Sequence, residues 1–397
     1  MNQTRSQRKD ARRAEILAAA ARLFRRCGFS GVGIDDIGAA VGISGPAVYR
    51  HFPSKQALLT EVIDGYLDRL LAEHERLTAA GDRQPASIAR ASIAAALNDP
   101  DGLVVHLRQM PQLAPEEQAR IQARSKQLLA SWDDLLPAAE TGRSHPAKAL
   151  RLRACAGALI GSAFARSSWP APYDPLVEPL ILAVLEAKLP PSGDEPTPAE
   201  PDRPGEPAHL VPASRREAIL AAATVLFRER DFNGVSLKDI GAAVGITASA
   251  VNRHFDSKEQ LLVTIFDRAA AQIAAAISSA LRRSPDPASA AVEIIKTYTG
   301  LAIDYRDLII INATQMYSLP EAERARRRRG QRMYIDELRH VLTRARPELS
   351  ADETRLRSNA AFALVNEVTM DDALSRRPHL AGELTALATA ILEAPAN

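Results

Sequence analysis

Apolar residues recur along this chain with the spacing of amphipathic helices. From Leu58 onward they fall at intervals of three and four residues, and the same arrangement begins again at Leu261. Ala, Leu, Arg and Glu dominate these stretches, and the alternation of apolar and polar residues that marks a strand is absent. The pattern therefore predicts an all-α protein in which each helix buries one apolar stripe.

This helical pattern occurs twice. Residues 16–64 align with residues 219–267 at an offset of 203 without a gap, and 29 of the 49 paired positions are identical. Weaker similarities continue downstream, where Arg151-Leu152-Arg153 matches Arg355-Leu356-Arg357 at an offset of 204. Solenoid repeats have periods of roughly 20–50 residues. The longer period predicts that a whole domain is duplicated, each copy ending in a body of about six helices.

The segment between the copies has a different composition. Residues 190–212 contain eight prolines and five acidic groups among 23 residues. Such a segment buries too little apolar surface to offset the entropy lost on ordering, which predicts a semi-extended linker. In a polyproline conformation this linker spans up to roughly 70 Å.

Residues 34–52 have the pattern of two short helices joined by a tight turn. Gly42 can adopt the positive φ that ends the first helix, and Ser44 is placed to cap the second. The second helix, residues 45–51, has the right size for the major groove of DNA. It turns three polar side chains outward: Tyr49, Arg50 and His51. The pattern predicts a helix-turn-helix.

The second copy keeps this scaffold and changes some of its surface. Gly245 and Thr247 repeat the turn and the cap, and Ser236 opens a capping box that the first copy lacks. Three outward positions differ between the copies: Gly45 against Ala248, Pro46 against Ser249, and Tyr49 against Asn252. The two helices are therefore not expected to read identical half-sites.

Together these motifs resemble the DNA-binding domain of the TetR family of bacterial transcriptional regulators. The resemblance covers about 50 residues of each copy. In the first copy it rests on Phe24, Gly31, Ile37, Gly42, Ile43, Ala47, Val48, Tyr49, His51, Phe52, Lys55 and Leu58. It implies a dimer that binds a near-palindromic operator and holds an effector pocket in its C-terminal body.

The resemblance also implies which residues contact double-stranded operator DNA. Positions matching residues 44–50 approach base edges in the family, and positions matching Tyr49, His51 and Lys55 hold phosphates. The implied contacts in the first copy are Ser44, Gly45, Pro46, Ala47, Tyr49, Arg50, His51 and Lys55. In the second copy they are Thr247, Ala248, Ser249, Asn252, Arg253, His254 and Lys258.

Five segments are expected in chain order. They are a helix-turn-helix domain over residues 1–55, a helical effector and dimerisation body over 56–189, the linker over 190–212, a second helix-turn-helix domain over 213–258, and a second body over 259–397. By resemblance, the last two helices of each body are expected to form the dimer's four-helix bundle.

Positive charge is concentrated in the first copy. Residues 1–55 hold ten Lys and Arg against four Asp and Glu, whereas residues 212–258 hold seven against five. Because phosphate neutralisation supplies much of the affinity for DNA, the first copy is predicted to bind more strongly. The basic segment at residues 5–13 is expected either to enter the minor groove or to be a disordered arm.

The bodies contain apolar faces interrupted by a few polar groups, as ligand cavities do. By resemblance the effector is expected to be an apolar or amphipathic small molecule. Its candidate contacts are His106, Gln109, Met110 and Trp132 in the first copy, and Tyr298, Tyr305, Asn312, Gln315, Met316 and Asn366 in the second. Each is equally compatible with a satisfied core residue. The arginine run at residues 324–329 is either a solvated helix face or a site for an anionic effector.

Other function classes find no support in the chain. Cys27 and Cys155 make no disulfide framework, and neither they nor the scattered histidines have metal-ligand spacing, so no metal or cofactor is expected. No apolar run approaches the roughly 18 residues of a membrane span, and the N-terminus lacks the apolar core of a signal peptide. No catalytic residues are assembled. We therefore expect a cytoplasmic protein that is not an enzyme and has no membrane partner.

Two functional hypotheses remain open. The first is a ligand-responsive repressor whose two copies pair within one chain as a pseudo-dimer, although pairing between chains would give a homodimer. The alternative is a DNA-binding protein with no small-molecule input, whose second copy is a structural or dimerisation half.

Overall fold

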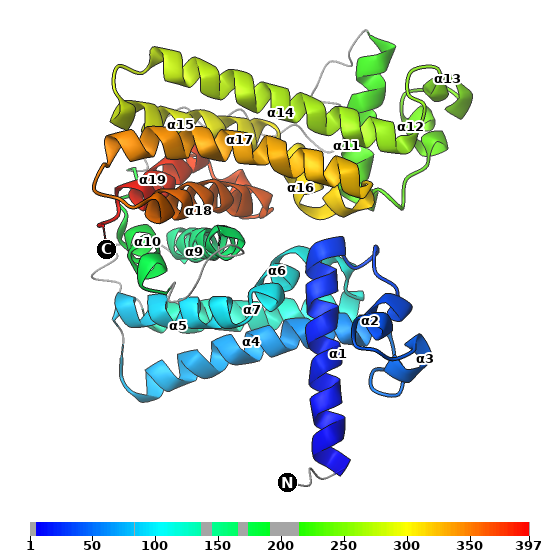
Figure 1. Ribbon diagram of the computed structural model, residues 1–397, viewed down its shortest axis with the longest axis horizontal. Helices are drawn as coiled ribbons and strands as arrows, with labels where there is room; N and C mark the ends of the chain where they lie inside the picture. The colour runs from blue at the N-terminus through cyan, green and yellow to red at the C-terminus, as the bar shows by residue number, and fades with distance from the viewer. Residues whose placement is uncertain (1–4, 83, 136–144, 166–173, 191–213, 397) are drawn as a thin grey trace. The chain divides into compact units, whose positions relative to one another are not determined.

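A computed structural model describes residues 5–82, 84–135, 145–165, 174–190 and 214–396, and Figure 1 shows the arrangement of their helices. The described residues form helices and contain no strand, which confirms the predicted all-α class. The chain divides into two compact units, Met1–Glu186 and Ala187–Ala396, and each is described by itself. Apart from its first residue, the predicted linker lies outside the described residues.

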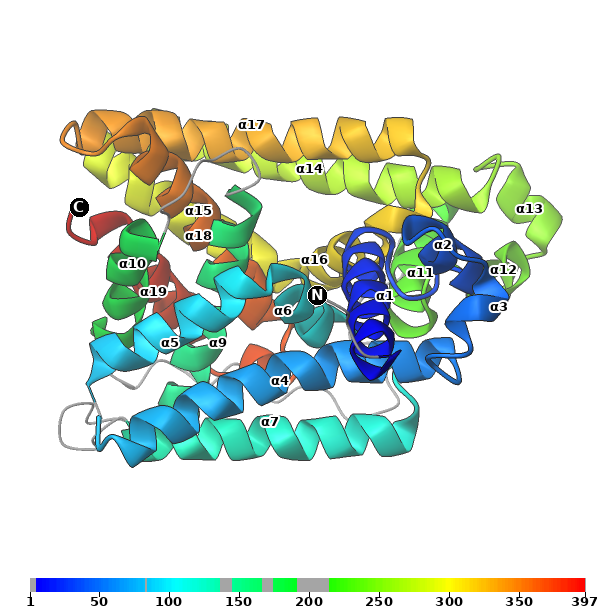
Figure 2. The ribbon, with the colours of Figure 1, turned by 60° about the horizontal axis from the view of Figure 1, so that its bottom comes forward.

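The first unit starts with a helix-turn-helix domain and continues into a helical body. The domain consists of α1 (Arg5–Cys27), α2 (Ile34–Ala40) and α3 (Gly45–Val48). The body consists of α4 (Lys55–Ala79), α5 (Pro85–Asn98), α6 (Pro100–Gln109), the 3-10 helix η1 (Met110–Gln112), α7 (Pro115–Leu135), α9 (His145–Ala165) and α10 (Asp174–Glu186). Within the body, α4 runs alongside α7, as Figure 2 shows.

The second unit repeats this order. Its domain consists of α11 (Arg215–Arg230), α12 (Leu237–Ala243) and α13 (Ala248–Asn252). Its body consists of α14 (Lys258–Arg283), α15 (Pro287–Asp304), α16 (Arg306–Gln315), η3 (Met316–Ser318), α17 (Glu321–Ala345), α18 (Ala351–Met370), η4 (Leu374–Arg376) and α19 (Leu380–Glu393).

One apolar core joins the domain to the body in each unit. In the first unit, side chains of α1, α2 and α3 pack with side chains of α4, α6 and α7: Phe24, Ile37, Val48, Leu59, Val105 and Ile121 belong to this cluster. In the second, the cluster includes Phe227, Ile240, Val251, Leu262 and Ile311. Each fully buried side chain of this kind stabilises the fold by roughly 1.5–3 kcal/mol. The shared core makes α4 and α14 part of both domain and body.

The basic N-terminal segment is helical rather than an arm. Helix α1 begins at Arg5 and is 23 residues long, whereas α11 has 16 residues. The expectations of a short first helix and of a disordered arm are therefore wrong, whereas contact of this segment with the minor groove stays a prediction. Arg12, placed in that arm, instead donates to the Val41 carbonyl oxygen at 3.3 Å from within α1.

An ion pair links the first helix of each unit to the long helix that follows the domain. In the first unit α1 supplies the cation, Arg13, and α4 supplies Glu61. In the second unit α11 supplies the anion, because Glu217 accepts from Arg268 of α14 at 2.6 Å. The two ion pairs join corresponding helices with the charges reversed, but they use different positions, since Arg13 aligns with Arg216 and Glu61 with Thr264.

Among the described residues, one helix is long and apolar enough to cross a membrane when judged by length and composition. This helix is α14, and 28% of its most apolar window is buried. Core helices of globular proteins pass the same test, and α14 packs against α11, α15 and α17.

Candidate nucleic-acid interface and effector site

A tight glycine turn positions the recognition segment of each unit. Gly42 has a φ of 71° and Gly245 a φ of 69°, as the sequence predicts for the end of a helix. After the turn, the Ile43 amide donates to the Gly38 carbonyl oxygen at 2.9 Å, which folds the next helix back over α2. Thr247 caps α13 by accepting from the Ala250 amide, whereas the Ser44 side chain makes no capping bond to α3.

The recognition helices are shorter than predicted. Helix α3 ends at Val48, and the chain continues in a tighter turn in which the His51 amide donates to the Val48 carbonyl oxygen at 2.9 Å. Tyr49 and Arg50 therefore lie at the end of the helix rather than in its middle, and the Tyr49 side chain is 53% exposed. An aromatic side chain this exposed is available to a partner.

Most of the predicted DNA contacts lie on the surface. The exposed ones are Ser44, Pro46, Tyr49 and Arg50 in the first unit, and Thr247, Ser249, Asn252, Arg253 and His254 in the second. The half-buried ones are Ala47, His51, Lys55, Ala248 and Lys258. Their contact with DNA stays a prediction.

Gly45 departs from this pattern because it is buried. A Cβ atom at this position would lie 2.0 Å from Oδ1 of Asp35, the first acidic residue of α2. The lack of a side chain therefore allows α3 to approach α2, and the interpretation of Gly45 as an outward base contact is wrong. In the second unit Ala248 occurs here and is half-buried.

An arginine of the first helix braces the end of each recognition segment. Arg13 donates to the His51 carbonyl oxygen, and its guanidinium lies 4.0 Å from the centre of the Phe52 ring. Arg216 repeats both contacts. Its Nη1 donates to the His254 carbonyl oxygen at 2.8 Å, and its guanidinium lies 4.2 Å from the centre of the Phe255 ring. Sequence analysis missed this pair, although the offset of 203 aligns the two arginines.

Lys55 and Lys258 support the fold in addition to any contact with phosphate. Nζ of Lys55 donates to the carbonyl oxygens of Phe29 and Val32, both at 3.0 Å. Lys258 makes the same two bonds in the second unit, at 2.6 and 2.8 Å. Burial lowers the pKa of both ammonium groups. Two of three donors are thus committed, and phosphate contact through the third stays a prediction.

Replacing Lys55 with methionine should lower the free energy of unfolding of the first unit by about 2–3 kcal/mol. The change leaves the Phe29 and Val32 carbonyl oxygens without their charged donor, and denaturant unfolding measures the loss. Lys126→Met, at an exposed position of α7, removes the same charge and should change stability by about 0.5 kcal/mol or less. Equal stability of the two variants would contradict the structural role of Lys55.

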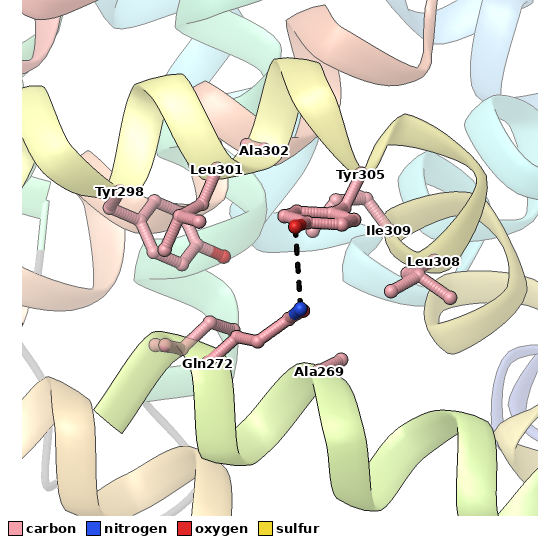
Figure 3. Close-up of a pocket in the computed structure, with 9 residues that line it drawn as sticks. Ala269, Gln272, Tyr298, Leu301, Ala302, Tyr305, Leu308 and Ile309 are labelled. Carbon is pink, nitrogen blue, oxygen red and sulfur yellow. Dashed lines mark hydrogen bonds between the residues drawn. The ribbon is translucent and has the colours of Figure 1, made fainter. Parts of the chain in front are cut away.

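The second body contains a small cavity among α14, α15 and α16. It holds about 20 Å³, which is room for about one water molecule and far below the roughly 300–1,000 Å³ of ligand pockets. The lining residues are Ala269, Gln272, Ile273, Tyr298, Leu301, Ala302, Tyr305, Leu308 and Ile309, which Figure 3 shows. None of them is charged.

Two of the predicted effector contacts line this cavity, and a third supports it. Tyr298 and Tyr305 are lining residues, and Nε2 of Gln272 donates to the Tyr305 hydroxyl at 3.3 Å (Figure 3). The Tyr298 hydroxyl donates to Oδ1 of Asn366 at 2.8 Å. Burial raises the pKa of Tyr298 to about 12. Sequence analysis missed Gln272, because α14 matches α4 poorly at this position.

Several other predicted effector contacts lie elsewhere. Asn312 and Met316 do not line the cavity, and Met110 packs against the core of the first unit. His106 lies beside Tyr66, with 5.8 Å between the ring centres. Trp132 belongs to α7, but its side chain lies outside the described residues.

Gln109 and Gln315, also predicted as effector contacts, instead connect the body to the domain. Oε1 of Gln109 accepts from the Phe29 amide at 3.1 Å, and Nε2 of Gln315 donates to the Phe227 carbonyl oxygen. Both are buried and hold these bonds, which favours a structural role over contact with an effector. The sixth helix of each unit, α6 or α16, is therefore hydrogen-bonded to residues at the C-terminal end of the first helix, α1 or α11.

Ion pairs reinforce this connection. Arg25 of α1 lies 3.0 Å from Asp101 of α6, and Arg228 of α11 lies 3.1 Å from Asp307 of α16. Displacement of α6 or α16 would therefore pull on the helix-turn-helix domain.

Most of the arginine run at residues 324–329 is paired within the second unit. Arg327 is largely buried and lies 2.7 Å from Asp267 of α14, which also pairs with Arg326 at 3.2 Å. Arg324 and Arg328 pair with Glu321. The run fastens α17 to α14 and to its own first turn, which disfavours a site for an anionic effector. Within the described residues, no group of three potential metal ligands occurs.

Comparison with known families finds two matches in this chain. The family described as "Bacterial regulatory proteins, tetR family" matches residues 16–62 and residues 219–265. Each match contains the glycine turn, the recognition segment and the start of α4 or α14. The matches therefore fall on the two candidate interfaces.

Characterised relatives match mainly over the same region. The chain is 37% identical over 73 residues to the HTH-type transcriptional repressor KstR2 of Rhodococcus jostii (strain RHA1), covering 18% of this chain and 36% of that protein. It is 43% identical over 60 residues to the HTH-type transcriptional regulator EthR of Mycolicibacterium smegmatis, covering 15% of this chain and 28% of that protein. The alignments thus span about a third of these relatives.

Solved structures of similar proteins align with less than half of this chain. The TetR family transcriptional regulator PfmR from Thermus thermophilus aligns with a TM-score of 0.41 and 23% identity over 46% of this chain and 98% of that chain. The ketosteroid transcriptional regulator KstR2 of Mycobacterium tuberculosis aligns with a TM-score of 0.37 and 18% identity over 46% of this chain and 94% of that chain.

Proposed function

Because this chain belongs to the TetR family of bacterial regulatory proteins and carries two of its units in tandem, we propose that it regulates transcription by binding operator DNA. Both helix-turn-helix domains contact the duplex, and an apolar or amphipathic effector releases it, which makes the protein a ligand-responsive repressor. It acts in the cytoplasm, where its DNA lies.

One observation carries this proposal. Two copies of an exposed recognition segment are each held by an equivalent arginine brace and an equivalent half-buried lysine. Rigid support of this kind fixes the register of side chains that enter a groove. These supporting contacts are the same in both units, whereas the exposed residue at the end of the recognition helix differs, Tyr49 in the first and Asn252 in the second. Both features fit two domains that bind DNA and prefer different bases.

The two units pair within one chain in this proposal. A linker that joins two matching units raises the effective concentration of one for the other, and internal pairing avoids the entropy lost when two chains associate. A pseudo-dimer of this kind reads two unequal half-sites about 34–36 Å apart on a near-palindromic operator. Pairing between chains instead gives a homodimer with four DNA-binding domains.

Effector binding is proposed to act through α16. Leu308 and Ile309 of α16 line the cavity, and the same helix is bonded to α11 by Gln315 and by the Arg228–Asp307 pair. Because the space has room for about one water molecule, a ligand that enters it must displace α16, and these bonds carry the displacement to the recognition segment. The alternative, a second unit with only a structural role, is favoured by the small charge excess of residues 212–258.

Light scattering of the full chain, alone and with DNA from its own promoter, tests the proposal. For the pseudo-dimer we expect the mass of one chain, 42.9 kDa, and one chain bound to each operator. Twice that mass would show pairing between chains. Absence of DNA binding at modest salt would refute the regulatory function itself.

Replacing Tyr49 with alanine should weaken operator binding about tenfold, and replacing Asn252 should weaken it less. The first domain carries the larger positive charge and an exposed aromatic side chain, so it is expected to supply more of the affinity. Fluorescence anisotropy at several salt concentrations measures both variants. The opposite ranking would show that the second domain anchors the protein.

A further inference from the structure

We propose that the turn after α11 is a strained latch that sets the position of the second recognition segment and is released when α16 is displaced. The latch consists of two residues: Asp231, which carries the strain, and Gln315, which holds it. This inference rests on the proposed effector response and names the residue at which that response passes from the body to the domain.

The turn that follows the first helix has a left-handed backbone conformation in both units. In the first unit Gly28 has a φ of 67°. At the offset of 203 the second unit has Asp231 here, with a φ of 59° and a ψ of 161°. In the part of the chain that the structure describes, Asp231 is the one non-glycine residue with a positive φ. Glycine adopts this conformation freely, whereas a residue with a Cβ atom does so only where its surroundings force it. The second unit therefore stores strain where the first has none.

Contacts before and after Asp231 hold it in this conformation. The Phe227 carbonyl oxygen, in the last turn of α11, accepts from Nε2 of Gln315. On the other side, the Phe232 carbonyl oxygen accepts from Nζ of Lys258 at 2.6 Å, and the centres of the Phe227 and Phe232 rings lie 5.4 Å apart. Asp231 joins these two fixed points, so the change of chain direction falls on its φ and ψ.

Gln315 links the strained residue to α16, which packs against α11 (Figure 1). Its Nε2 also donates to Oδ1 of Asp231 at 3.3 Å. Gln109, its counterpart at an offset of 206, uses the other end of the amide, because its Oε1 accepts from the Phe29 amide at 3.1 Å. Oε1 of Gln315 is buried and has no hydrogen-bond partner within the described residues. Both junctions thus contain the same glutamine, and the second uses it to hold a strained residue.

Release of the strain changes the course of the chain towards the recognition segment. The Gly234 amide donates to the Asp231 carbonyl oxygen at 3.2 Å, so residues 231–234 form one turn, and α12 begins at Leu237. A displacement of α16 breaks the bonds of Gln315 and lets the φ of Asp231 return to negative values, which moves α12 and α13. Strain of this kind shifts an equilibrium roughly 5- to 150-fold. An effector therefore needs a smaller difference in affinity between the two states to withdraw the second recognition segment than to withdraw the first.

Hydrogen exchange of the full chain, measured by mass spectrometry on peptides within residues 237–254, tests this inference. Asp231→Ala keeps the strain and removes the carboxylate, whereas Asp231→Gly removes both. We expect exchange in Asp231→Gly to be about fivefold slower than in Asp231→Ala, because opening no longer relieves strain.

The matched control pair is Asp256→Ala and Asp256→Gly, at an exposed residue of the same domain that has no positive φ. Glycine at such a residue gains freedom in the open state without relieving strain. Exchange in Asp256→Gly should therefore be as fast as in Asp256→Ala or faster.

Gln315→Met measures the link to α16. It should accelerate exchange of the same peptides, and the acceleration should be at least about threefold smaller in the Asp231→Gly background, because the bond to Oδ1 is already absent there. Peptides within residues 34–51 of the first unit are the internal reference and should exchange equally in all variants.

Three results would overturn the inference. Exchange in Asp231→Gly that is no slower than in Asp231→Ala would show that the turn is not strained. Equal acceleration by Gln315→Met in both backgrounds would show that Gln315 does not hold Asp231. Changes of the same size in the reference peptides would show that the variants act on overall stability. Operator binding of the natural protein, measured separately, decides the regulatory function, so failure of one proposal is distinguishable from failure of the other.

Discussion

Replacing Gly38 with alanine is expected to weaken operator binding about 100-fold or more, towards the non-specific level that lies roughly 10³–10⁷-fold below specific affinity. A Cβ atom at this position would lie 2.7 Å from the Ile43 carbonyl oxygen and 3.1 Å from the Gly45 amide nitrogen. Both atoms belong to the backbone of the turn, which cannot yield as a flexible side chain does. The recognition segment must therefore shift, and its base contacts are lost together.

The chain supplies a matched pair and a control for this experiment. Gly241→Ala makes the same contact in the second unit, at 2.7 Å from the Ile246 carbonyl oxygen. Gly330→Ala places a methyl group on α17 with no atom within 4 Å and should leave binding unchanged. Anisotropy gives the affinities, and circular dichroism verifies the fold. Full affinity in a folded Gly38→Ala protein would show that the first recognition segment does not contact the operator.

Acid should destabilise the first unit by about 3 kcal/mol between pH 6.5 and pH 4 through His106 alone. Burial, and secondarily the charge of Arg153, lowers the pKa of His106 from 6.5 to about 4. Below pH 6.5 the unfolded chain binds a proton that the folded unit does not bind until about pH 4. The stability that neutral His106 provides is therefore present above pH 6.5 and is lost as the pH falls towards 4.

The second unit provides the control residue for this pH dependence. At the offset of 206, Asn312 corresponds to His106 and does not titrate. In His106→Asn the acid-dependent loss should disappear. Hydrogen exchange of α6 peptides at several pH values measures the effect in the first unit. An unchanged pH dependence in the variant would exclude His106 as its source.

The helix-turn-helix could be predicted from the sequence because its constraints are local. A positive φ at Gly42, a buried Ile37 and an exposed Tyr49 each follow from a residue type at a fixed spacing. The predicted length of the recognition helix was wrong, because hydrophobic spacing does not distinguish a last α-helical turn from a tighter turn. The burial of Gly45 was missed, because it depends on Asp35, ten positions earlier and on another helix.

The bodies were predicted as helices, but their sites were not. The sequence similarity at offset 204 pairs Arg153 with Arg357, whereas the structure gives Arg151 and Arg357 the same role. Nη1 of Arg151 donates to the Val184 carbonyl oxygen at 2.7 Å, and Nη1 of Arg357 donates to that of Ile391 at 3.1 Å. The offset changes after α4, and only contacts between helices reveal by how much. For the same reason Gln315 was assigned to the effector rather than to the junction with α11.

The reversed ion pair between the first helix and the next long helix makes the two directions of sequence exchange between the halves of the gene unequal. Gene conversion that copied residues 1–55 over their counterparts would put Ala14 in the place of Glu217 and leave Arg268 without its carboxylate. Conversion in the other direction would bring Arg216 opposite Glu61, which can pair as Arg13 does. Exposed ion pairs contribute about 0–1 kcal/mol, so exchange in the first direction should cost the second unit only a little stability, and exchange in the other direction should keep the pair of the first unit.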